Sequence, residues 1–108
     1  MTVTVESSGT QTAVISTEHT LATPTTAKVF SLSVDTNAMV NGDVLELRIK
    51  RKVLSGGTER LLFYAVFSNV QSEPIKCSVP VIAPFGATFT LKQTAGTGRD
   101  FPWSVESL

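Results

Sequence analysis

The stretch from Val44 to Leu54, VLELRIKRKVL, places an apolar side chain at almost every second position, with charged side chains between them. This alternation is typical of a strand in an antiparallel sheet that has one face in the core and the other in water. No amphipathic helix longer than one or two turns is evident anywhere in the chain. We therefore predict a strand whose inner face is Leu45, Leu47, Ile49 and Val53 and whose outer face is Glu46, Arg48, Lys50 and Lys52.

The segment from Thr58 to Ser68, TERLLFYAVFS, returns with Leu61, Phe63, Ala65 and Phe67 on one face. A two-residue loop at Gly56-Gly57 would set Lys50 against Phe63 and Glu46 against Phe67, placing charges among aromatic side chains. A three-residue loop, Ser55-Gly56-Gly57, instead pairs Ile49 with Phe63, Leu47 with Ala65 and Leu45 with Phe67. A slip of one residue would turn every side chain over, so we predict the three-residue hairpin, with Gly57 in the left-handed conformation.

Composition extends the β prediction to the whole chain. Fifteen threonines and thirteen valines carry a branched Cβ, which suits strands better than helices. We predict one all-β domain, an antiparallel β-sandwich (jelly-roll-like) or a small barrel of seven or eight short strands. We expect residues 1–26 to form an extended arm that includes the first strands and becomes ordered by contact with a partner. We expect residues 27–108 to form the body of the sandwich. In the first part of the chain we predict strands at 2–6 and 12–17 around a turn at 7–9, followed by a connection at 19–26. The other predicted strands are 28–34, 75–82, 87–94 and 101–108.

Proline marks one of these strands as unusual. The segment Ile75 to Ile82 contains Pro80, which has no amide hydrogen to donate to a sheet. We therefore expect this strand to lie at a sheet edge or to break at Pro80. Cys77 alternates with Ile75 and Val79, which predicts a buried small side chain and not a reactive thiol.

Charge and cysteine content exclude several classes of protein. Nine basic and nine acidic side chains give a formal net charge of zero, which argues against binding nucleic acid through bulk electrostatics. A single cysteine excludes an internal disulfide and a cysteine-rich zinc site. The N-terminal residues lack the features of a signal peptide, and no apolar run approaches the roughly 18 residues that span a bilayer. We expect folding in the cytoplasm, with no membrane association, metal or cofactor.

The run Ala95-Gly96-Thr97-Gly98-Arg99 raises the question of a phosphate-binding loop. Such a loop of the Walker type needs four residues between its glycines, then lysine and a hydroxyl residue, then a helix. Here the glycines are two apart, and the Phe101-Pro102-Trp103 that follows does not begin a helix. We predict a tight turn with glycines at positive φ.

The chemistry of an enzyme is also missing from the sequence. His19 is the only histidine and lies in a threonine-rich segment, where a solvated or capping role fits better than that of a general base. The carboxylates are scattered singly beside turns or cations, which does not match a calcium loop. We therefore predict a protein that is not an enzyme.

Two surface features could bind a partner. Arg48, Lys50, Arg51, Lys52 and Arg60 gather five of the nine positive charges on one hairpin. Three interpretations are open: a strand face that is simply solvated, a contact with an acidic protein surface, and a contact with nucleic acid. The second feature is the end of the chain, where Arg99, Phe101 and Trp103 either complete the core or reach a neighbouring subunit.

Residues 40–108 resemble a group of small proteins encoded among the virion structural genes of tailed bacteriophages. The resemblance rests on Asn41-Gly42-Asp43-Val44, on Gly56-Gly57-Thr58-Glu59-Arg60, and on LKQTAGTGR from Leu91 followed by Phe101-Pro102-Trp103. It implies a virion component without a catalytic or metal centre. The implied role is a capsid decoration (cement) protein, present in many copies, whose partners are the major capsid protein and copies of itself.

Two other functions remain open at this point. One is a tail or baseplate-associated β-sandwich module that binds glycan, which would require exposed aromatic side chains on one face. The other is a nucleotide-dependent enzyme, which would require binding at Gly96 and Arg99.

Overall fold

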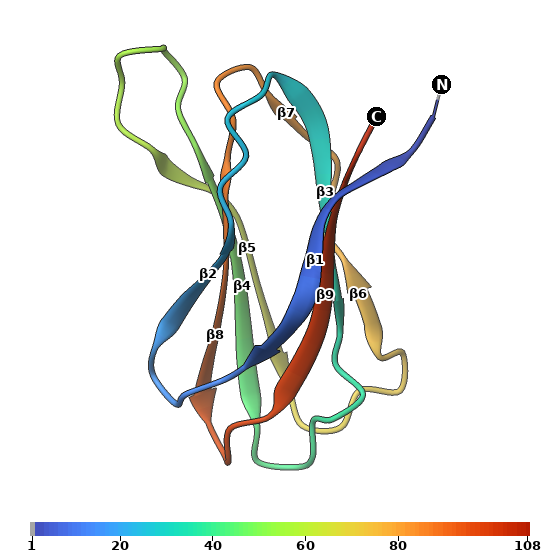
Figure 1. Cartoon of the computed structure of the whole chain (residues 1–108). Helices are drawn as coiled ribbons and strands as arrows, with labels where there is room; N and C mark the ends of the chain where they lie inside the picture. Colours follow the sequence, from blue (N-terminus) through green and yellow to red (C-terminus); the bar gives the residue numbers. More distant parts are fainter. Residues whose placement is uncertain (1) are drawn as a thin grey trace.

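The computed structural model describes residues 2–108, which fold into nine strands arranged in two antiparallel sheets (Figure 1). The five-stranded sheet contains β1 (Thr4–Thr12), β9 (Asp100–Ser107), β3 (Lys28–Asp35) and β6 (Ile75–Cys77) in that order, with β7 (Val81–Ala83) also paired to β3. The four-stranded sheet runs β2 (Glu18–Ala22), β8 (Thr88–Ala95), β4 (Val44–Arg51) and β5 (Arg60–Ser68). Within residues 2–108 no helix is long and apolar enough to cross a membrane.

The order of the strands is that of a jelly roll. β6 and β7 both pair with β3 and are separated by Ser78-Val79-Pro80, so they count as one interrupted strand. The resulting eight strands form two sheets of four, and most connections cross from one sheet to the other. The predicted antiparallel sandwich is therefore confirmed, and the strand at Pro80 breaks as expected.

The core lies between the two sheets and comes from the alternating positions of the central strands. Phe30 of β3 meets Phe89 of β8 edge to face, with ring centroids 6.0 Å apart, and joins the sheets. The predicted inner faces are confirmed in β3 and β4, which pack against the inner faces of β8 and β9. The buried apolar side chains of these strands are Phe30, Leu32, Val34, Leu45, Leu47, Ile49, Phe89, Leu91, Phe101 and Val105.

The β4–β5 hairpin follows the predicted register but not the predicted loop. Ile49 pairs with Phe63, Leu47 with Ala65 and Leu45 with Phe67, as expected. The ladder ends at Arg51 and Arg60, so eight residues, 52–59, form the loop and Val53 lies in solvent instead of the core. Two features account for this. Leu62 is an extra residue in β5 that shifts the pairing, and the facing cations Arg51 and Arg60 do not favour a longer ladder.

Two further predictions about this hairpin, for Gly57 and for Leu61, were also wrong. Gly57 does not adopt the left-handed conformation, although its N–H donates to the carbonyl oxygen of Leu54 at 2.9 Å to close a turn. Leu61, predicted on the inner face, is exposed because it adjoins the bulge.

The first 26 residues contribute an outer strand to each sheet. The predicted turn at residues 7–9 is wrong: it lies within β1, which pairs along its length with β9 and contains a bulge between Val5 and Ser7. Gly9 is opposite Trp103 in this ladder, and the indole ring packs beside it. The turn instead falls at residues 13–17, so the strand predicted at 12–17 is wrong, and β2 (Glu18–Ala22) lies mostly within the segment 19–26 that was predicted as a connection.

Candidate interaction surface

The residues with the most reactive chemistry do not come together. Within residues 2–108 no group of three or more histidine, cysteine or acidic side chains is placed to hold a metal ion. The Nε2 atom of His19 accepts a hydrogen bond from the Val14 N–H at 3.0 Å, so this histidine caps the turn before β2, one of the two roles expected for it.

Cys77 is exposed, which contradicts the predicted buried position. It lies in β6, at the edge of the five-stranded sheet, with its Sγ 3.3 Å from the Ser33 hydroxyl. The buried residue of this segment is Ser78, whose hydroxyl accepts the Leu32 N–H at 2.9 Å. The alternation itself holds, because Ile75, Cys77 and Val79 are all exposed while Ser78 is buried; the prediction assigned this row to the inner face, and the structure places it on the outer face.

The 96–99 segment is a turn between β8 and β9, as predicted. Gly96 has φ of 89°, and a Cβ there would overlap Oδ1 of Asp43. Gly98 is not at positive φ, contrary to expectation, but a Cβ there would overlap the Ala13 carbonyl oxygen. The two glycines are therefore needed for close packing of the turn against the rest of the chain.

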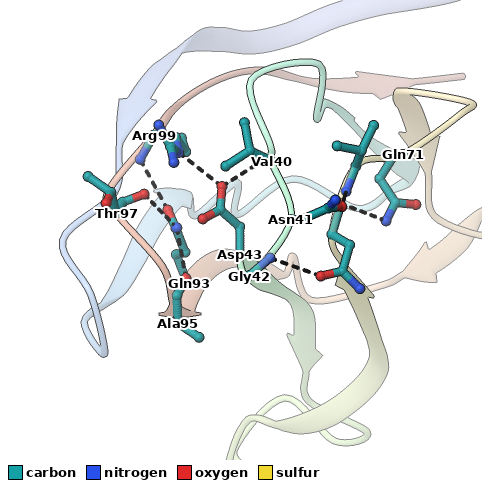
Figure 2. Close-up of polar contacts among 11 residues, drawn as sticks. Val40, Asn41, Gly42, Asp43, Gln71, Gln93, Ala95, Thr97 and Arg99 are labelled. Atoms are coloured by element: carbon teal, nitrogen blue, oxygen red, sulfur yellow. Dashed lines mark hydrogen bonds and ion pairs between the residues drawn. The ribbon is translucent and has the colours of Figure 1, made fainter.

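A buried glutamine holds this turn from inside. Gln93 is completely buried, and its Nε2 donates to the carbonyl oxygens of Ala95 at 3.0 Å and Thr97 at 2.8 Å. Its Oε1 accepts the Arg99 N–H at 3.1 Å. The amide of Arg99, which a phosphate-binding loop would offer to its ligand, is thus used within the protein (Figure 2).

Arg99 also has a structural partner. Its Nε lies 2.9 Å from Oδ2 of Asp43, whose side chain is 1% exposed, and the Val40 N–H donates to the same oxygen at 3.0 Å (Figure 2). Burial by itself raises the pKa of the Asp43 carboxyl, but the hydrogen bonds from Val40 and Arg99 outweigh it and hold that pKa below its ordinary value. The Arg99 guanidinium thus neutralises the buried charge of Asp43. From the sequence alone, Arg99 was predicted as a contact for a partner, and this ion pair was not expected.

The neighbouring loops are tied in the same way. The Asn69 side chain accepts the Gly42 N–H at 2.9 Å, and the Asn41 side chain accepts the Val70 N–H at 3.4 Å (Figure 2). Gln71 Nε2 donates to the Ser68 carbonyl oxygen at 2.8 Å. We call the loops 40–43, 68–71 and 95–99 together the polar end of the sandwich.

Two of the five cations in the predicted basic cluster are paired with the protein's own carboxylates. Arg48 forms an ion pair of 2.6 Å with Glu46 and stacks over the ring of Tyr64, 4.9 Å from its centroid. Lys50 forms an ion pair of 2.8 Å with Glu18, and this contact lowers the pKa of the Glu18 carboxyl. Both cations lie on the outer face of the four-stranded sheet, as the alternation predicted.

The remaining three cations of the cluster lie near loop 52–59. The Arg51 guanidinium reaches across to the other sheet and donates to the Ile82 carbonyl oxygen. Lys52 begins the loop and Arg60 follows it, and neither forms an ion pair with the described residues. The cluster therefore does not act as one patch, because its members point to different parts of the surface.

The aromatic end of the chain belongs to the core. Phe101 is completely buried, which contradicts its prediction as a partner contact. Trp103 is partly buried, packs against the core and lines a shallow groove with Asp35 and Ile75. Of the two alternatives for this segment, packing within the sandwich describes Phe101 fully and Trp103 in large part.

The end of the sandwich opposite the polar end exposes apolar side chains. Loop 52–59 projects there, with Val53 76% and Leu54 71% exposed; the turn after β7 lies at the same end, and the two marked ends of the chain lie on its other side (Figure 1). A groove of about 170 Å³ between β3, Pro80 and Leu108 has almost wholly apolar walls. We call this the apolar end; its exposed side chains are Val3, Val53, Leu54, Leu61, Ile82, Phe85 and Leu108.

Sequence reasoning missed the apolar end because it placed Val53 in a strand and gave Leu54 no role. The signal was present in the sequence as two adjacent apolar residues directly before Ser55-Gly56-Gly57. Adjacent apolar residues before a turn cannot both face the core of a strand, so at least one had to be exposed.

Comparison with known proteins does not place this chain in a family. No family model, no curated protein and no solved structure matches it.

Proposed function

We propose that this chain is a structural protein of the virion of a tailed bacteriophage, a capsid decoration (cement) protein that binds the lattice of the major capsid protein and does not catalyse a reaction. The proposal starts from the resemblance of residues 40–108 to small virion proteins. The jelly-roll strand order supports it by analogy, because this fold is common in capsid proteins, although it also occurs in lectins.

The apolar end is the observation that carries the proposal. Large apolar side chains that gather in solvent are typical of protein interaction sites, and here they project on a loop beside two cations, Lys52 and Arg60. The polar end has the opposite character, since its side chains are used in internal contacts. A sandwich with one end held by internal polar contacts and the other end apolar suits a protein that attaches to the capsid surface.

The proposal is tested on purified particles of the phage that encodes the chain. Mass spectrometry and quantitative gel electrophoresis should find the protein at a high copy number in the head. A handful of copies would indicate a tail or neck protein instead, and absence from particles would refute a virion role.

The attachment surface is tested by adding the purified chain to capsids that lack it and measuring co-sedimentation. Leu54→Asp should abolish binding because it places a charge at the tip of the apolar loop. Val70→Asp is the matched control, since Val70 is 61% exposed but lies at the polar end. Equal binding by the two variants would show that the apolar end is not the attachment surface.

The glycan-binding alternative has a weaker basis in the structure. Tyr64 and Phe85 are the exposed aromatic side chains among residues 2–108, and they lie on different elements, β5 and the turn after β7. Arg48 covers one face of the Tyr64 ring. Selective binding on a glycan array that is lost in Tyr64→Ala would support this alternative over the capsid proposal.

A further inference from the structure

The strand β5 is a long apolar strand at the edge of its sheet. It pairs with β4 on one side and has no strand on the other. Its nine residues, RLLFYAVFS, carry a single charge, at Arg60. Exposed edges of this kind normally carry charged side chains or proline, which prevent pairing with another chain. In β5 the bulge at Leu62 protects one end, and the Gln71 side chain covers the Ser68 carbonyl at the other, so residues 63–67 are left open.

The backbone contacts at the end of the hairpin show which groups face the open side. The Asn69 N–H donates to the Asp43 carbonyl oxygen at 2.9 Å, whereas the Asp43 N–H donates to the Val40 carbonyl oxygen, so positions 43 and 69 form one of the two bonds of a hydrogen-bonded pair and fix the alternation of the ladder that follows. Such pairs alternate along an antiparallel ladder, so Phe63, Ala65 and Phe67 direct their N–H and C=O groups to β4. Tyr64 and Val66 therefore direct theirs away from β4, to the open side.

The side chains of the same residues are apolar and accessible. Tyr64 is 47% and Val66 46% exposed on the outer face, and Leu62 lies in the same row. On the inner face, Phe63 and Phe67 are only partly buried, and Lys76 of β6 lies over the Phe67 ring at 5.2 Å. Free backbone groups and apolar side chains thus occur together along one edge, which is the combination that strand addition uses.

We propose that two copies of this chain associate by antiparallel pairing of their β5 strands, which joins the two four-stranded sheets into one continuous sheet across the dimer. A second copy fits this edge because antiparallel pairing puts the two Arg60 side chains at opposite ends, so no like charges meet along β5. The apolar row of Leu62, Tyr64 and Val66 then meets the same row of its partner. The formal net charge of zero adds no general repulsion between copies, and a two-fold axis closes the assembly at two chains.

Hydrogen exchange tests this pairing on the unaltered chain, and its result is independent of any virion role. The amide hydrogens of Tyr64 and Val66 should exchange quickly in dilute solution and slow down as the protein concentration rises. Those of Ala65 and Phe67, bonded to β4 in both states, should change little and serve as internal controls. Exchange at Tyr64 and Val66 that stays fast while dimers form would overturn the proposal.

Sedimentation supplies the second measurement. The unaltered chain should show a monomer–dimer equilibrium, and Val66→Lys should weaken dimerisation at least about tenfold by placing a charge on each edge. Val5→Lys is the matched control, because Val5 is 60% exposed on β1, at the edge of the other sheet, and it should dimerise like the unaltered chain. A chain that remains monomeric at about 1 mM would overturn the proposal and leave β5 to a different partner. If Val66→Lys does not fold, the exchange experiment decides.

Discussion

The polar end and the apolar end of the sandwich use their loops for different purposes. At the polar end, the buried side chains of Asp43 and Gln93 bond the loops 40–43 and 95–99, so these exposed loops are fixed to the body of the sandwich (Figure 2). At the apolar end, loop 52–59 is tied mainly at its base, where Glu59 accepts the Thr88 hydroxyl at 2.7 Å. We therefore expect substitutions at the polar end to act on stability and, under the proposed function, those at the apolar end to act on binding.

The largest effect on stability is expected from Asp43→Ala. This change leaves the Val40 N–H without its acceptor and the Arg99 guanidinium without its ion pair. Breaking a buried ion pair typically costs 3–5 kcal/mol, and because Arg99 can turn toward water we expect about 3 kcal/mol. Urea unfolding measures this free energy. A loss below about 1 kcal/mol would mean that the polar end is not held by this pair.

A smaller loss of folding stability is expected at acidic pH. The pKa of Asp43 is lower in the folded protein than its ordinary value of 3.8, so the unfolded chain binds the proton more tightly. The stability that this carboxylate contributes is therefore complete above about pH 4 and is lost as the pH falls toward the folded pKa. Urea unfolding at a series of pH values should show this decline, and the decline should be shallower in Asp43→Asn. Parallel curves for the two proteins would contradict the assignment.

A still smaller effect is expected at the basic cluster. Lys50→Ala removes an exposed ion pair with Glu18 and should cost no more than about 0.5 kcal/mol, less in high salt. Reversal of charge at Lys50 and Lys52 should leave the fold intact, and capsid co-sedimentation then measures whether either lysine contributes to attachment. Binding that does not change would identify both as solvated side chains.

The smallest effect on stability is expected at the tip of loop 52–59. Val53→Ser and Leu54→Asp alter side chains that are mostly in solvent. The free energy of unfolding, measured by thermal denaturation, should therefore change by less than about 0.5 kcal/mol. The same variants should have the largest effect on capsid binding. A strong loss of stability would show that the loop packs against the body, and the contrast between the two ends would then fail.

The central strands could be predicted because burial on one face imposes a period of two. The pairing of Ile49 with Phe63 followed from matching apolar residues across a hairpin. The end of the hairpin could not be predicted in this way, because a bulge at Leu62 changes the register without changing composition. The strand β1 was missed for a related reason: Ser7-Ser8-Gly9 resembles a turn, but pairing with β9 outweighs local preference.

The candidate surfaces were only partly predictable. Positive charges on a hairpin are visible in the sequence, but their partners Glu18 and Glu46 become apparent only when the strands are aligned. The contact between Asp43 and Arg99 spans 56 positions of the chain, and the segments that carry them showed no complementary pattern. The open edge of β5 depends on the order of strands in the sheet, which an isolated hairpin does not determine.

The two marked chain ends lie at the same end of the sandwich as loop 52–59, on its other side, which has a practical consequence for anyone who labels this protein (Figure 1). A fluorescent domain or affinity tag fused at either end would crowd the apolar end, and under the proposed function we expect it to weaken attachment without disturbing the fold. The turn at residues 13–17 lies away from that end but is a poor insertion point, because the Ser16 N–H donates to the Gln93 carbonyl oxygen at 2.7 Å and the Ala13 N–H to the Arg99 carbonyl oxygen at 2.9 Å. An insertion there would loosen the polar end.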